Sequence, residues 1–177
     1  ISALAYLEKA LPSIGFNSVC NKVYRKAKID ALPLRFDETL VTAEDLMFNF
    51  SYLIGNQSVS LVQEPLYIYR RKRVSLTSRE TPEAARASVA AAMRIAGTLE
   101  TGNAAPQAGC RIRVDALMTM LRAPDFTLRD CRKILERLPE NFWRDCRFGK
   151  SKQLLLRLAK SSPGAARFLT RLRYFWK

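Results

Sequence analysis

Hydrophobic side chains follow a helical spacing through the second half of the chain. From residue 79 onward, apolar residues recur every three or four positions, which predicts helices at about 82–99, 111–121, 127–138, 151–160 and 163–175, with a loop at 102–109. Thr81-Pro82 and Ser162-Pro163 each place a capping hydroxyl before a first-turn proline, and Thr127 with Asp130 is typical of a capping box. We therefore expect residues 79–177 to form an all-helical extension.

Residues 1–78 mix helical and extended patterns. Helices are expected at about 3–11, 18–29 and 42–54, the last begun by the hydroxyl of Thr42 and ended at Gly55. Two segments rich in β-formers, 58–62 and 66–70, flank Glu64-Pro65 and predict two short strands. The expected fold class is α/β: a domain with a small mixed sheet at 1–78 and an appended all-α subdomain, so that the whole chain is mostly helical.

Composition excludes several kinds of protein. The 177 residues include 48% hydrophobic residues and no histidine. Such a composition is globular, and the lack of histidine excludes Ser-His-Asp and Cys-His catalytic sites and histidine metal sites. The four cysteines form no C-x-x-C pair, so we interpret them as mostly buried, reduced thiols of a cytosolic protein.

Positive charge is concentrated in the helical part. Lys and Arg number 30 against 16 Asp and Glu, a net charge of +14. Nine basic residues and no acidic one lie between Arg147 and Lys177. In 151–177 they alternate with leucines and aromatics, which indicates either an amphipathic helix on an anionic membrane or a packed helix with a basic outer face. A nucleic-acid partner is disfavoured, because no helix-turn-helix, RRM, KH or zinc pattern is visible.

Five short motifs follow one another within about sixty residues. They are Ser18-Val-Cys-Asn-Lys-Val-Tyr-Arg25, Leu34-Arg-Phe-Asp-Glu38, Glu44-Asp-Leu-Met-Phe-Asn49, Glu64-Pro-Leu-Tyr-Ile-Tyr-Arg70 and Ser75-Leu-Thr77. Their order and spacing resemble the second half of bacterial family 2 glycosyltransferases, over roughly residues 15–78. The resemblance implies that 1–78 is the C-terminal, acceptor-side part of a GT-A (Rossmann-like) catalytic domain, and 79–177 looks like the variable helical extension of these enzymes.

The resemblance implies a reaction and a catalytic pair. These enzymes transfer a sugar from a nucleotide-sugar donor to a saccharide or lipid-linked acceptor, here in surface polysaccharide synthesis. Asp45 would take the proton from the acceptor hydroxyl, and Glu44 would orient the acceptor or a neighbouring basic residue. The alternative is that both carboxylates only complement the dipole at the start of their helix.

The acceptor side has four further candidates. Asn21 and Lys22 would form a polar wall of the acceptor pocket, or they begin a helix with a solvated lysine. Tyr67 and Tyr69 share one face of the second predicted strand, where they would stack on a sugar ring or pack under the helix of Glu44.

On the donor side, Arg70 of the cationic run 70–73 would contact the donor diphosphate, or belongs to a solvated turn. Ser75 and Thr77 would lie in a loop that closes over the donor. The parent enzyme is expected to use a divalent metal, Mg or Mn, but the chain contains no Asp-x-Asp and no glycine-rich phosphate loop, so no ligand is assigned.

We therefore expect a C-terminal half that transfers nothing by itself. In the cell we expect it in the cytoplasm, either free or peripheral on the inner face of the membrane. The alternative function is a basic helical module that binds nucleic acid or a membrane surface without catalysis.

Overall fold

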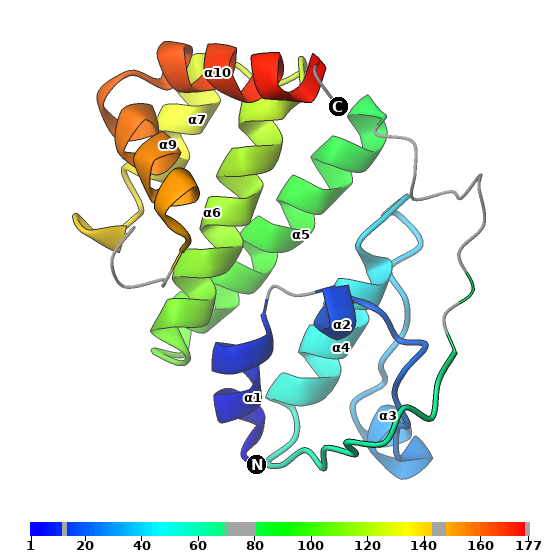
Figure 1. Cartoon of the computed structure of the whole chain (residues 1–177). Coiled ribbons are helices and arrows are strands. Elements are labelled where there is room, and N and C mark those ends of the chain that lie inside the picture. The colour runs from blue at the N-terminus through cyan, green and yellow to red at the C-terminus, as the bar shows by residue number, and fades with distance from the viewer. Residues whose placement is uncertain (12–13, 69, 71–80, 143–147, 176–177) are drawn as a thin grey trace.

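The fold is an assembly of helices around one long helical hairpin. The computed structural model describes the chain except residues 12–13, 69, 71–80, 143–147 and 176–177. Its helices are α1 (Ala3–Ala10), α2 (Ile14–Asn17), α3 (Lys26–Ala31), α4 (Glu44–Ile54), α5 (Pro82–Thr101), α6 (Pro106–Arg122), α7 (Leu128–Leu135), α9 (Lys150–Ser161) and α10 (Pro163–Phe175). Figure 1 shows α5 and α6 side by side, with α7, α9 and α10 on one side of this pair and α1, α2 and α4 on the other, where α1 contacts α6 and α4 contacts α5. No helix in these described parts has the length and apolar character that crossing a bilayer requires.

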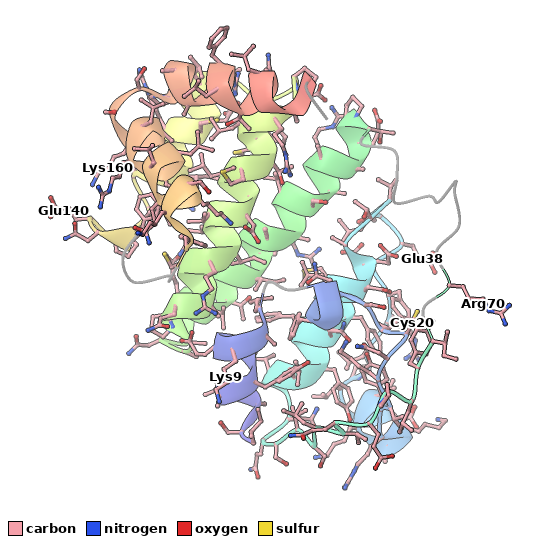
Figure 2. The ribbon with its side chains drawn as sticks, viewed as in Figure 1. Lys9, Cys20, Glu38, Arg70, Glu140 and Lys160 are labelled. Atoms are coloured by element: carbon pink, nitrogen blue, oxygen red, sulfur yellow. The ribbon has the colours of Figure 1, made fainter. Side chains whose placement is uncertain are left out.

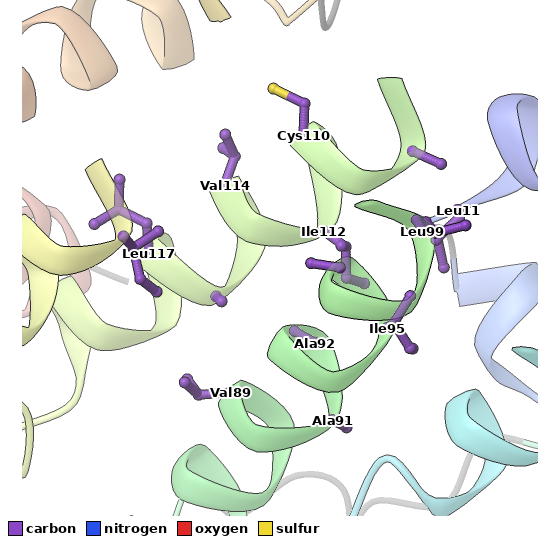
Figure 3. Close-up of a cluster of buried hydrophobic side chains, with 14 of the residues drawn as sticks. Leu11, Val89, Ala91, Ala92, Ile95, Leu99, Cys110, Ile112, Val114 and Leu117 are labelled. Atoms are coloured by element: carbon purple, nitrogen blue, oxygen red, sulfur yellow. The ribbon is translucent and has the colours of Figure 1, made fainter. Parts of the chain in front are cut away.

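The α5–α6 hairpin contributes the largest share of the hydrophobic core. Small side chains let the two backbones approach closely, and larger aliphatic side chains fill the space around them (Figure 3). The small group comprises Ala91, Ala92, Ala96, Ala108 and Ala116, and the larger group comprises Ile95, Leu99, Ile112, Leu117 and Leu121. The same core cluster continues into α1 and α4 through Leu7, Leu46 and Phe50. The division at residue 79 therefore stays a prediction, and the core has members on both sides of it.

Several predicted helix ends are confirmed. The Thr81 hydroxyl accepts the Ala84 N–H at 3.1 Å at the start of α5. Thr127 and Asp130 form the capping box of α7, and α4 ends at Gly55. These ends are encoded by residues within one turn of the terminus, which is why local sequence predicts them.

Helix α6 is capped from a distant part of the chain. Its N-cap residue, Ala105, has a left-handed backbone (φ 47°) and offers no side-chain acceptor. Instead the Glu8 carboxylate of α1 accepts the N–H groups of Gln107 at 3.2 Å and Ala108 at 2.8 Å. Arg111 of α6 in turn donates to the Glu8 carbonyl at 2.6 Å. Glu8 thereby fastens α1 to the first turn of α6, and the loop predicted over 102–109 is shorter than expected.

The expected α/β fold is wrong: the structure is helical, and its described residues contain no sheet. Backbone pairing near the first predicted strand is limited to an isolated antiparallel bridge between Ser2 and Ser58. A strand needs a neighbour that pairs with its backbone along its length. In the described part of the chain, such pairing joins residues 1–3 to 57–59 only, as in the bond from the Val59 N–H to the Ile1 carbonyl at 2.9 Å, and it does not continue along 60–62 or 66–68. Their β-forming side chains consequently face solvent, as in Ile68, which is 83% exposed.

Two other predictions about residues 18–54 are wrong in detail. Helix α3 begins only at Lys26, not near Ser18. Helix α4 begins after Ala43, whose backbone is left-handed (φ 67°), and no side chain caps it, so Thr42 lies one residue too early to serve. Asp45 therefore occupies the second position of the helix rather than the third.

Candidate functional site

Three of the predicted acceptor-side residues come together at the first turn of α4. The half-buried Asp45 carboxylate accepts the Val19 N–H at 3.3 Å. The Lys22 ammonium donates to the Ser18 carbonyl and to Asn21 Oδ1, the latter at 2.7 Å. Glu44 lies beside Asp45 at the first position of the helix and is also half-buried. The turn at 18–22 thus places an ammonium, an amide and a carboxylate in one region.

Burial and charge act in opposite directions on Lys22. Partial removal from water lowers the pKa of its ammonium below the ordinary value, and the negative charge of Asp45 partly offsets this decrease. The two groups bind the backbone of consecutive residues, Lys22 at the Ser18 carbonyl and Asp45 at the Val19 N–H, so they lie in the same region. A cation next to a carboxylate is an arrangement that can bind and orient a hydroxyl group.

Asn49 is the residue that holds this region together. It lies one turn after Asp45 on α4 and is only 1% exposed. Its Nδ2 donates to the Phe16 carbonyl at 2.6 Å and to the carbonyls of Asn17 and Ser18, both at 3.3 Å. Its Oδ1 accepts the Tyr24 hydroxyl at 2.5 Å. Sequence reasoning gave Asn49 no role, although a lone amide inside the apolar run 46–50 was the available signal.

Aromatic side chains complete the support. Tyr24 meets Phe48 edge-on with ring centres 5.4 Å apart, and it meets Tyr52 in the same way at 5.0 Å. Phe36 stacks on Phe48 at 4.5 Å. Burial, followed by the nearby Asp45 charge, raises the pKa of the Tyr24 phenol. Three of the five motifs therefore pack into one unit around α4, and Tyr24 acts in the packing of that unit.

The remaining candidates belong to both sides of the predicted site. On the acceptor side, Tyr67 is 49% exposed. On the donor side, Arg70 is exposed, with its side chain extending away from the body of the molecule (Figure 2). Tyr69, Ser75 and Thr77 lie outside the described residues. The candidates that the structure brings together are thus Asn21, Lys22, Glu44 and Asp45.

The cavities lie elsewhere. A cavity of about 1040 Å³ lies between α1, the end of α4 and α5, lined mainly by apolar and small residues such as Leu4, Ile54, Met93 and Gly97. A second, of about 430 Å³, lies between α5, α6 and α7. Neither is lined by Glu44 or Asp45, and the larger one is at the opposite end of α4. The acceptor pocket expected at Asp45 is therefore not one of these two cavities.

The part of the chain that is described contains no candidate metal site, and its cysteines are free thiols. No group of three or more Cys, Asp or Glu residues is placed there to hold a metal ion. Cys110 and Cys131 are buried free thiols, whereas Cys20 is exposed. Burial raises the pKa of the Cys131 thiol, which Arg167 partly counteracts at 3.4 Å. These residues offer no set of ligands that fits Mg or Mn, so no step below is assigned to a metal.

Comparison with known proteins adds no relative: no family model, curated protein or solved structure matches the chain. The resemblance to family 2 glycosyltransferases therefore stays a prediction. Any functional conclusion depends on the residues at the first turn of α4 and on the motifs that surround them.

Proposed function

We propose that the chain is the acceptor-binding part of an inverting glycosyltransferase, with Asp45 as the base. The observation that carries this proposal is the arrangement at the start of α4, where the half-buried Asp45 carboxylate is oriented by the Val19 N–H and has Lys22 as a cationic neighbour. The register of the E-D, N-K and R-F-D motifs supports it, because these motifs pack against one another around α4.

The chemistry needs a fixed carboxylate at the acceptor. As the acceptor oxygen forms its bond to the anomeric carbon of the donor, Asp45 takes the hydroxyl proton. The bond from that carbon to the nucleoside diphosphate breaks, and the diphosphate leaves with the electron pair. Val19 fixes the direction of the carboxylate, while Lys22 and Asn21 are placed to hold polar groups of the acceptor.

Donor binding is assigned to residues other than those of this unit. The sequence contains no glycine-rich phosphate loop. The donor site would be supplied by residues outside this sequence, with Arg70 as the candidate contribution from this chain. The isolated chain would then bind an acceptor without transferring sugar.

Two assays test the proposal. In the first assay the chain is incubated with UDP- and GDP-sugars plus Mg or Mn, and no hydrolysis is expected. Rapid hydrolysis would show that this chain contains a donor site, which would contradict the assignment of donor binding to residues outside it. Saturation-transfer NMR against a panel of saccharides then tests acceptor binding. Lys22→Met is expected to weaken binding about tenfold, whereas the exposed Lys9→Met on α1 (Figure 2) serves as a matched control. Equal binding by both variants would contradict the proposed acceptor site.

A further inference from the structure

The outer face of α10 carries an apolar stripe that nothing in the described chain covers. Phe168, Leu169 and Leu172 are 64%, 48% and 40% exposed. Together with Ala165 they have the spacing of one helix face. The opposite face contains Ala166 and Thr170, which are buried against the rest of the molecule. α10 is therefore apolar on both its packed side and its solvent side, and the solvent side needs an explanation.

The two C-terminal helices are strongly basic. α9 and α10 contain no acidic residue, and their described side chains include the basic residues Lys150, Lys152, Arg157, Lys160, Arg167 and Arg171. Lys152 has a carboxylate partner, Asp115, at 2.9 Å. Lys160 donates to the Glu140 backbone carbonyl at 3.1 Å (Figure 2). The two helices thus present exposed apolar side chains within a positive field.

We infer that this surface, formed by the outer face of α10 and the basic residues of α9 and α10, docks on an anionic phospholipid membrane. Phe168, Leu169 and Leu172 would enter the boundary between headgroups and acyl chains, while the cations meet the lipid phosphates. A second copy of the chain fits less well, because each copy has a net charge of +14 and two such surfaces repel. A nucleic acid would use the charge but would leave the apolar stripe without a role.

Co-sedimentation with lipid vesicles tests this inference on the whole chain. Vesicles with about 30% phosphatidylserine in phosphatidylcholine are compared with pure phosphatidylcholine. The variant Phe168→Gln/Leu169→Gln/Leu172→Gln keeps good helix formers at exposed positions and is expected to reduce binding about tenfold or more. The matched control is Leu61→Gln/Leu66→Gln/Ile68→Gln. These three apolar side chains are 57%, 75% and 83% exposed, on average more than those of the α10 variant. Their segment, 61–68, lies far from α10 (Figure 1).

The expected result is strong binding to anionic vesicles only, weakened by salt, lost in the α10 variant and retained in the control variant. Leu169→Glu alone, which places a carboxylate in the stripe at a solvent-exposed site, should also reduce binding, and circular dichroism confirms that each variant keeps its helices. Equal binding to neutral vesicles, or equal loss in both triple variants, would overturn the inference. It would also be overturned by a dimer that the α10 variant abolishes, or by binding to an RNA duplex but to no vesicle.

Discussion

Replacing Asn49 by Ala tests whether one buried amide holds residues 16–24 on α4. The substitution removes the 2.6 Å bond to the Phe16 carbonyl and the acceptor of the Tyr24 hydroxyl, at a position that is 1% exposed. A buried polar group left without its partner costs about 1–3 kcal/mol. The longer bonds to the carbonyls of Asn17 and Ser18, at 3.3 Å, are lost as well. Counting mainly the Phe16 carbonyl and the Tyr24 hydroxyl, we expect the free energy of unfolding to fall by about 3 kcal/mol.

A double-mutant cycle with Tyr24→Phe isolates the bond between the two side chains. Tyr24→Phe alone removes the hydroxyl and is expected to cost about 1 kcal/mol. In the double variant no hydroxyl is left unpaired, so its cost should be smaller than the sum of the single costs by about 1 kcal/mol. Asn141→Ala, at an exposed position, is the matched control and should stay within about 0.5 kcal/mol of the unaltered chain.

Urea unfolding followed by circular dichroism measures these differences. With a slope of about 3 kcal/mol per molar urea, a loss of 3 kcal/mol moves the midpoint by about 1 M. Two results would refute the view that this amide fixes residues 16–24 on α4. One is a loss of free energy of unfolding below about 1 kcal/mol for Asn49→Ala, and the other is a double variant whose loss equals the sum of the two single losses.

Three further changes probe the rest of the fold. Glu8→Ala removes the acceptor at the start of α6 and should lower the free energy of unfolding, measured in urea, by about 1–2 kcal/mol. The control Glu38→Ala, at an exposed site (Figure 2), should change it very little. Equal effects of the two variants would contradict the role of Glu8 as the cap of α6. Gly97→Ala should stabilise the protein by about 0.5–1 kcal/mol, since a Cβ there meets no atom within 4 Å, and a lower melting temperature would contradict this. The Thr39 hydroxyl and then Arg94, which pairs at 2.5 Å, hold the pKa of Asp37 below its ordinary 3.8. This stabilisation is present above pH 3.8 and is lost as the pH falls through the lowered pKa, so Asp37→Asn should flatten the acid limb of the stability curve, and an unchanged limb would contradict the assignment.

Sequence predicted the features that depend on neighbouring residues. The helices of the described part of 79–177 follow from the three-to-four-residue spacing of apolar positions. The caps at Thr81 and Thr127 and the stop at Gly55 follow from side chains within one turn of the helix end. The closeness of Asn21, Lys22 and Asp45 followed only from the family resemblance, because their spacing along the chain does not dictate it.

Features that depend on distant residues were missed. The cap of α6 is supplied by Glu8, about a hundred residues earlier, which no local pattern reveals. Residues 18–25 were expected to be helical. In the structure the Ser18 carbonyl accepts a hydrogen bond from the Asn49 side chain, whereas in a helix it would accept one from the backbone N–H four residues later. The segments 58–62 and 66–70 have β-forming residues, and β propensity produces a strand only where another strand offers its backbone.

The kinetic effect of Asp45→Asn, measured in the glycosyltransferase of which we propose this sequence to be a part, tests the central claim most directly. The amide keeps the size and an acceptor for the Val19 N–H but cannot take a proton. We predict a fall in kcat of about 10²–10⁴ with KM for the acceptor nearly unchanged. An unchanged kcat, or a loss confined to KM, would contradict the assignment of Asp45 as the base.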